Sequence, residues 1–469
     1  MEFLDRELEL ATLREHLLAR PGAGLFVLYG RRRIGKTELL RRALEGVPRA
    51  AYHVATHSTL AEELRRLSAT LARAWSVPLL AAQPLASAEA LLAFLSAVEG
   101  RAVLALDEFP YLVESCPELP GLLQACWDET LAHRDLKLIV CGSSIAMMER
   151  TFFSPRNPLF GRRTGQLRLG PLAPHHLGEA FPWQLPEVVE LAALFGGVPG
   201  YLARLDPALS LGENLRQRVL AVGEPLYEEV PFLLREELRE PRVYYAILAT
   251  IAGGAQKFGE ISSKVGLDRA NLNRYLATLA ELGLLEREVP VTERHPEKSR
   301  KGLYRIADPF ITTWFAFVHP HRDRLERGEV DEVWRTTIQP ALPAYLSRAV
   351  EKVLQSLFTS GPLAAVVPFS VGAAGRYWSP TAEFDLVLFD QERRRAFVAE
   401  VKWGGRPVAP GLLADLRRRV AGEAAFAGLG VTYAVISRAG FTGPEVLDDS
   451  ERLIDFSGPP AGSDGGRRS

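Results

Sequence analysis

The sequence predicts an α/β protein in three parts: a parallel sheet with helices, a small helical unit with a hairpin, and a mixed α/β domain. Three observations lead to this fold class. Apolar strands and amphipathic helices alternate over residues 1–170, and three amphipathic helices followed by two short strands occupy 243–308. A further amphipathic helix and two paired strands lie within 335–456. Regular alternation of strand and helix is typical of a parallel sheet.

Length and composition set the outer limits. A chain of 469 residues should hold about three domains. Its net charge is -1, so any nucleic-acid binding must be local. Cys116, Cys126 and Cys141 form no CxxC pair, which argues against zinc or disulfides and favours a reducing cytoplasm. We expect no membrane segment and no secretory leader, and a disordered tail over 457–469.

The first strand leads into a glycine loop. LFVLY at 25–29 reads as a buried strand, GRRRIGKT follows it, and TELLRRAL reads as a helix. In G-x-x-x-x-G-K-T the loop amides and lysine meet a triphosphate, while the threonine reaches its Mg²⁺. An accidental match in a glycine turn is the alternative, and the scarcity of lysine in this chain argues against it. The predicted ATP-binding residues of this loop are Gly30, Arg31, Arg32, Arg33, Ile34, Gly35, Lys36 and Thr37.

Two further strands end in polar residues. RAVLALDE at 101–108 ends in Asp107 and Glu108, and we expect this strand to be the neighbour of the P-loop strand. There Asp107 would support Mg²⁺ and Glu108 would polarise the attacking water, although two such acids can also cap a helix. LKLIVCGSS at 136–144 ends in Ser143 and Ser144. Ser143 would sense the γ-phosphate, or these serines would cap the next helix, and both interpretations stay open.

A basic cluster and a helical segment complete this domain. One of Arg156, Arg162 and Arg163, with Arg162 as the candidate, would contact the γ-phosphate in cis or from a neighbouring subunit of a homo-oligomer. The alternative is a solvated surface. Residues 171–225 read as a helical lid, in which Pro199 would touch adenine or would merely start a helix. We place the domain at 1–225, with its core at 1–170.

Residues 230–310 read as a winged helix-turn-helix. Three amphipathic helices precede two short strands, LEREVPV and LYRIADP, which a polar basic turn connects. Exposed cations and amides at the start of the third helix suit a DNA groove, and a basic wing tip suits phosphates. Docking of another protein is the alternative. The predicted DNA contacts are Arg269, Asn271, Asn273 and Arg274 on the helix, and Lys298, Arg300 and Lys301 on the wing.

The last domain, at 335–456, carries a second set of acids. AEFDLVLF places two acids on one face of a strand, and AFVAEVKW places an acid and a lysine on one face of the next. Paired carboxylates hold Mg²⁺, and a lysine nearby stabilises a phosphorane or orients water. A salt-bridged hairpin is the alternative. The predicted site comprises Asp385 and Glu400 as metal ligands, with Lys402, Glu383 and the upstream Glu351 around them.

These stretches together resemble the archaeal-type P-loop ATPase family, a branch of the STAND and AAA-related ATPases. The matching segments are FLDRELEL, GRRRIGKTEL, ALDEFPYL, VCGSS, PLFGRRT, GGVPGYL, EFDLVLF…AEVKW and YAVISRAGFT. The resemblance implies a P-loop NTPase with a helical lid, a winged helix, and a restriction-endonuclease-like domain of the PD-(D/E)xK type. It implies hydrolysis roles for Asp107 and Glu108, and nuclease-type roles for Glu351, Asp385, Glu400 and Lys402.

Two functional hypotheses follow. The first is an ATPase that binds DNA through the winged helix and positions a Mg²⁺-dependent nuclease-like domain on it. The second is a nucleotide-controlled switch or scaffold of the STAND type, which docks proteins and cuts no DNA. The complete D…ExK set favours the first, and the near-neutral charge favours the second because nonspecific DNA binding usually draws on a basic surface.

Overall fold

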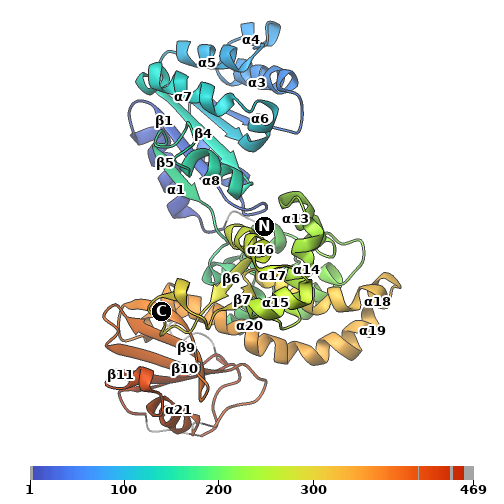
Figure 1. Ribbon diagram of the computed structural model, residues 1–469, viewed down its shortest axis with the longest axis vertical. Coiled ribbons are helices and arrows are strands. Elements are labelled where there is room, and N and C mark those ends of the chain that lie inside the picture. The colour runs from blue at the N-terminus through green and yellow to red at the C-terminus, as the bar shows by residue number, and fades with distance from the viewer. Residues whose placement is uncertain (1–3, 410, 444–446, 459–469) are drawn as a thin grey trace, which may run out of the picture. The chain divides into compact units, whose positions relative to one another are not determined.

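The computed structural model describes residues 4–409, 411–443 and 447–458 (Figure 1). Apart from Ser457 and Gly458, the predicted disordered tail lies outside the described residues. The chain divides into two compact units, one over 3–171 and the other over 172–469, and each is described by itself. In the part that the structure describes, no helix is long and apolar enough to cross a membrane.

The N-terminal unit contains a five-stranded sheet in the order β2-β3-β4-β1-β5. All its pairings are parallel, and every residue of β1, β3 and β4 is buried. Strands covered on both faces need apolar residues throughout, which explains the uninterrupted apolar runs in the sequence. The strands are β1 (Gly24–Tyr29), β2 (Ala50–Val54), β3 (Ala102–Asp107), β4 (Leu136–Gly142) and β5 (Gly165–Arg168).

The expected pairing of the P-loop strand with the Asp107 strand is wrong. β4 lies between β1 and β3, pairing Leu25 with Leu138 on one side and Leu104 with Leu138 on the other. A parallel crossover fixes the direction in which a strand returns, and it leaves room for a later strand to insert. The residues that follow β4 therefore lie between the P-loop and the acids of β3.

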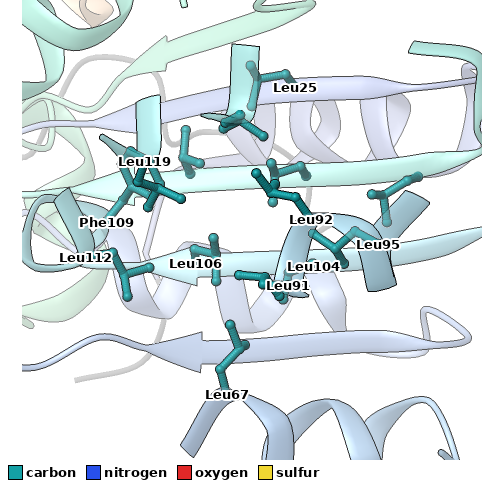
Figure 2. Close-up of a cluster of buried hydrophobic side chains, with 14 of the residues drawn as sticks. Leu25, Leu67, Leu91, Leu92, Leu95, Leu104, Leu106, Phe109, Leu112 and Leu119 are labelled. Atoms are coloured by element: carbon teal, nitrogen blue, oxygen red, sulfur yellow. The ribbon is translucent and has the colours of Figure 1, made fainter. Parts of the chain in front are cut away.

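Leucine side chains from strands and helices form the core of this unit (Figure 2). Leu25, Leu104 and Leu106 on the sheet meet Leu67, Leu91 and other residues from the covering helices. The helices are α1 (Glu7–Arg14), α2 (Lys36–Leu44), α3 (Leu60–Ala74), α4 (Leu79–Ala82), α5 (Ala88–Ala97), α6 (Phe109–Ser115), α7 (Leu119–Glu129) and α8 (Ile145–Phe153).

The C-terminal unit begins with helices, and the segment predicted as a lid clusters with this unit. Helix α10 packs against α17 and α20. The helices outside the winged helix are α9 (Leu177–Ala180), α10 (Leu185–Phe195), α11 (Pro199–Leu202), α12 (Leu211–Asn214), α13 (Glu229–Glu237), α17 (Pro309–Phe317), α18 (Arg322–Glu326), α19 (Val330–Val333), α20 (Gln339–Thr359) and α21 (Leu412–Ala421).

Three helices and an antiparallel hairpin form the predicted winged helix. Its third helix buries the leucines at helical spacing, Leu272, Leu276, Leu279 and, just beyond its end, Leu282. This apolar stripe fixes which face of the helix remains for solvent. The elements are α14 (Pro241–Ala252), α15 (Phe258–Val265), α16 (Arg269–Glu281), β6 (Leu285–Glu288) and β7 (Leu303–Ile306).

A mixed five-stranded sheet in the order β12-β11-β10-β9-β8 follows (Figure 1). β8, β9 and β10 pair antiparallel, whereas β10, β11 and β12 pair parallel. Its core also contains Val291, which comes from the loop between the two wing strands. The strands are β8 (Val371–Trp378), β9 (Glu383–Asp390), β10 (Arg395–Lys402), β11 (Gly430–Ser437) and β12 (Glu451–Asp455).

Candidate functional site

The glycine loop turns sharply between β1 and α2. At Gly30, with φ of 157°, a Cβ atom would lie 2.4 Å from the carbonyl oxygen of Leu169, so only glycine fits. Lys36 Nζ donates to the carbonyl oxygens of Gly30 at 2.8 Å and Arg31 at 3.0 Å. The lysine thus closes the loop on itself, and phosphate oxygens are the stronger acceptors that would replace these carbonyls.

The arginine run lies inside this loop. Arg33 has a φ of 64°, in the left-handed region that residues other than glycine rarely adopt. Arg32 donates to the hydroxyl of Tyr111 at 2.5 Å, which ties the loop to α6. Arg31 and Ile34 are buried. The run therefore belongs to the folded loop, although no contact with a nucleotide follows from this placement alone.

Asp107 accepts hydrogen bonds on both carboxylate oxygens. Thr37 Oγ1 and the Tyr52 hydroxyl donate to Oδ2 at 2.8 Å and 2.7 Å, and the Glu108 N–H donates to Oδ1 at 3.0 Å. Burial raises the pKa of Tyr52, and the neighbouring Asp107 carboxylate raises it further. Each of these donors is neutral, so none of them forms an ion pair with Asp107 that a Mg²⁺ ion would have to break.

Glu108 adopts a left-handed conformation, with φ of 53° and ψ of 42°. Its carboxylate accepts the Ser143 hydroxyl at 2.6 Å and 2.7 Å and the Ser143 N–H at 3.3 Å. Neither Glu108 nor Ser144 caps its helix through a side-chain hydrogen bond. The side chains of Glu108 and Ser143 are thus directed to each other at the edge of the sheet, rather than to the helix ends that the alternative interpretation requires.

Arg162 lies far from this edge. β5 runs parallel to β1 with Gly165 beside Phe26, so Arg162 precedes the amino end of β5, whereas the P-loop follows the carboxyl end of β1. Both Nε and Nη2 of Arg162 donate to the Asp128 carboxylate, at 3.2 Å and 2.9 Å. A contact with the γ-phosphate in cis is therefore wrong, and a contact in a neighbouring subunit stays a prediction.

The other predicted nucleotide contact lies in the second unit. Pro199 is the first residue of α11, the helix-starting position that proline favours. Its contact with adenine stays a prediction. Tyr52 is the side chain that sequence reasoning missed. Its hydroxyl reaches Asp107 because β2 pairs with β3, and strand order was the information that the sequence did not supply.

The predicted DNA-contact residues lie on exposed surface of the winged helix. Arg269, Asn273 and Arg274 are exposed, and Arg274 lies 3.9 Å from Glu240. Asn271 is exposed but bound to the helix cap, because its N–H and Nδ2 donate to Asp268 at 2.9 Å and 2.6 Å.

The wing tip is also exposed. Lys298 and Arg300 face solvent, and Lys301 donates to Glu293 at 2.8 Å. The side of the wing that carries Val291 packs instead into the core of the mixed sheet. The wing therefore serves internal packing at its root and leaves a basic tip outside.

In the mixed sheet, Asp385 and Glu400 lie on neighbouring strands. β9 and β10 pair Leu386 with Ala399, and Asp385 and Glu400 are the next residues of the two strands beyond this pair. Asp385 Oδ2 accepts the Val401 N–H at 2.8 Å. Glu400 forms two ion pairs, with Lys402 at 2.7 Å and with Arg419 at 2.7 Å.

Glu351 of α20 joins these acids. Its carboxylate lies 3.0 Å from Arg376 Nε, and its pKa is raised to about 7, chiefly by burial and also by the Asp385 carboxylate, against the effect of Arg376. Burial also raises the pKa of Asp385, with Glu400 adding to it. The structure thus gathers the predicted acids. Yet among the described residues no group of three or more His, Cys, Asp or Glu side chains is arranged to hold a metal ion.

Three known families match successive parts of the chain. A family described as an ATPase domain predominantly from Archaea matches residues 3–205, and an IclR helix-turn-helix domain matches 245–289. A family of archaeal and bacterial proteins of unknown function matches 314–409. The fold and these matches define a P-loop ATPase with a winged helix and a C-terminal mixed-sheet domain.

The uncharacterized protein MJECL04 of Methanocaldococcus jannaschii is 33% identical over 406 residues, which cover 86% of this chain and 87% of that protein. The chain therefore belongs to the same family as this archaeal protein.

Two solved structures are similar to this chain. The Walker-type ATPase paby2304 of Pyrococcus abyssi aligns with a TM-score of 0.50 and 24% identity, over 67% of this chain and 96% of that chain. The ORC2 protein of Aeropyrum pernix aligns with a TM-score of 0.44 and 16% identity, over 72% of this chain and 96% of that one. The first likeness supports the P-loop ATPase fold.

Proposed function

We propose that this ATPase hydrolyses ATP with Mg²⁺ at the edge formed by the P-loop, β3 and β4, and that it binds DNA through the winged helix. The observation that carries the proposal is the direction of the two acids. Asp107 is hydrogen-bonded to the P-loop threonine, and Glu108 is held by Ser143, which follows the strand between β1 and β3. Mg²⁺ would offset the charge of the phosphates there.

Each residue then has a defined task. Thr37 and Asp107 would hold Mg²⁺, and Lys36 would exchange the carbonyls of Gly30 and Arg31 for phosphate oxygens. Glu108 orients the attacking water and takes up its proton, since its carboxylate has neutral hydrogen-bond partners. Ser143 fixes the direction of Glu108.

Two substitutions test these roles. Glu108→Gln should bind ATP and hydrolyse it at least about 100-fold more slowly, because the amide cannot accept the proton. Lys36→Ala should lose nucleotide binding. The matched control is Glu114→Gln, an exposed acid of α6 whose ion-pair partner is His57. Hydrolysis by Glu108→Gln at the wild-type rate would overturn the assignment.

DNA binding rests on the winged helix. Exposed Arg269 and Asn273 suit base edges, and the exposed wing tip suits phosphates. Arg300→Ala with Lys301→Ala should weaken retention of every duplex alike and reduce its salt dependence. The control with the same charge change is Arg394→Ala with Arg418→Ala, two exposed arginines of the mixed-sheet domain. Equal loss in both double variants would favour protein docking.

A second candidate function is metal-dependent phosphodiester cleavage at the mixed sheet. The position of Asp385 and Glu400 on neighbouring strands, with buried Glu351 nearby, favours it. Asp385 and Glu400 would hold the metal, and Lys402 would offset charge on the phosphorane. Supercoiled plasmid with Mn²⁺ should be nicked by the wild type, whereas Asp385→Asn and Lys402→Ala should not nick it. Nicking that persists in Asp385→Asn would rule this site out.

A further inference from the structure

Arg376 of β8 lies where the wing hairpin meets the acids of the mixed sheet. Its side chain is only 15% exposed. Nε lies 3.0 Å from Glu351, Nη2 pairs with Glu383, and Nη1 lies 3.8 Å from Glu288 of wing strand β6. One guanidinium thus touches two acids of the candidate cleavage site and one acid of the wing.

The backbone of the same residue also holds the wing. The Val291 N–H donates to the Arg376 carbonyl oxygen at 2.9 Å, and the Val291 carbonyl accepts Arg393 Nη1 at 3.1 Å. The buried Val291 side chain packs in the core of the mixed sheet. Residues 289–302 connect this anchored valine to the exposed basic tip, so a force on the tip reaches Arg376 through a short stretch of chain.

Ion pairs continue this connection on both sides. Arg305 of β7 pairs with Glu288 at 2.7 Å, and Lys352, next to Glu351, pairs with Glu286 of β6. The wing hairpin therefore presents its own acids to the cations that border the site. The acids of the candidate site are paired with cations as well: Arg376 pairs with Glu351 and Glu383, and Lys402 and Arg419 pair with Glu400. A divalent cation must therefore displace a positively charged side chain in order to bind there.

We infer that Arg376 is a latch: it ties the wing hairpin to Glu351 and Glu383 and keeps the acid site closed to a divalent cation until the wing is displaced. The inference rests on the second candidate function, because it takes Asp385 and its neighbours as the metal site. Binding of the wing tip to DNA would then open the site where its substrate is present. Metal binding and wing docking compete, so each must weaken the other to the same extent.

The test measures Mn²⁺ binding to the full chain without nucleotide, by electron paramagnetic resonance. Arg376→Gln should bind Mn²⁺ at least about tenfold more tightly than the wild type, because a competing cation is gone. Arg376→Lys keeps the charge but cannot bridge all three acids, so its affinity for Mn²⁺ should lie between those of the wild type and Arg376→Gln. Arg393→Gln is the comparison variant: it loses one wing contact but keeps the Arg376 guanidinium on the acids, so its gain in Mn²⁺ affinity should be smaller than that of Arg376→Gln. Asp385→Asn added to Arg376→Gln should abolish the gain.

A second readout follows the wing itself. Saturating Mn²⁺ should speed hydrogen exchange at the Val291 amide in the wild type and not in Asp385→Asn. Suppose that the wild type binds Mn²⁺ in a way that depends on Asp385, and that Arg376→Gln binds Mn²⁺ no more tightly than the wild type. The latch is then wrong, whereas the metal site is supported. If no variant shows binding that depends on Asp385, the second candidate function fails and the latch with it. A gain in Arg393→Gln equal to that in Arg376→Gln would also overturn the latch.

Discussion

The two sets of acids in this protein differ in what holds them. At the edge of the N-terminal sheet, Asp107 and Glu108 accept hydrogen bonds from hydroxyls and amides. At the mixed sheet, Glu400 pairs with Lys402 and Arg419, and Glu351 pairs with Arg376. Both arrangements satisfy carboxylates that are partly or wholly removed from water.

The difference determines which site is ready for a divalent cation. Neutral donors orient a carboxylate and leave its charge in place, so a metal that arrives with a nucleotide meets an attractive field. Internal cations remove that field, and a metal must first break an ion pair. The first arrangement suits a site that binds a metal with each nucleotide. The second suits a site that binds a metal only after its ion pairs have been broken.

The largest effect on activity should come from removing the carboxylate of Asp107. Asp107→Asn should lower ATP hydrolysis at least about 100-fold, because Thr37 alone holds the metal poorly. Asp385→Asn should leave ATP hydrolysis unchanged. Steady-state phosphate release at saturating ATP measures both, and nucleotide binding in EDTA serves as the control for folding. Equal losses in both variants would break the contrast.

A buried histidine with a neutral partner extends the contrast to acid stability. His16 lies 2.9 Å from the Thr164 hydroxyl, and its pKa is lowered to about 4, chiefly by burial and also by Arg20 and Lys137. The unfolded chain takes up this proton near pH 6.5 and the folded chain only near pH 4, so stability falls as the pH drops through this window, by about 3 kcal/mol in total. Urea unfolding followed in the N-terminal unit should show a shallower pH dependence in His16→Gln. The same slope in both proteins would contradict the assignment.

A smaller effect should come from the residue that orients Glu108. Ser143→Ala removes its hydroxyl donor and should lower the rate of ATP hydrolysis about tenfold with little change in nucleotide affinity. Ser144→Ala is the matched control, since that hydroxyl forms no side-chain cap to α8. A change in affinity alone, with the rate preserved, would assign Ser143 to binding instead.

The smallest effect concerns stability of the mixed sheet. The pKa of Asp385 is raised, so the ionised carboxylate costs free energy in the folded state. An asparagine oxygen at this position would still accept the Val401 N–H. Asp385→Asn should therefore raise the free energy of unfolding by about 1 kcal/mol in EDTA. Thermal unfolding of the C-terminal unit measures it. A loss of stability would show that the Asp385 charge is needed by its neighbours.

Much of both sites follows from local sequence pattern. Buried apolar runs located β1, β3 and β4, and each run leads into residues of the site because parallel strands share a carboxyl edge. β1 leads into the P-loop, β3 ends in Asp107, and Ser143 follows β4. The alternation in β9 and β10 likewise placed Asp385 and Glu400 on adjacent strands. Leucine spacing located the third helix of the winged helix, where Leu272, Leu276 and Leu279 are buried within α16.

These local patterns do not predict the order of the strands in a sheet. Nothing local indicates that β4 inserts between β1 and β3, and the Ser143 contact depends on that order. The position of Arg162 depends on the direction in which β5 joins β1. Likewise, Val291 reads as part of a wing, and only tertiary packing shows that it is buried in another sheet.

Mn²⁺ binding to the wild-type chain, measured with and without a nonhydrolysable ATP analogue, tests the central contrast most directly. The account predicts one tightly bound Mn²⁺ per chain that requires the analogue, is lost in Asp107→Asn and is kept in Asp385→Asn. Tight Mn²⁺ binding without nucleotide that disappears in Asp385→Asn would contradict it, because the ion-paired acids would then be the open site.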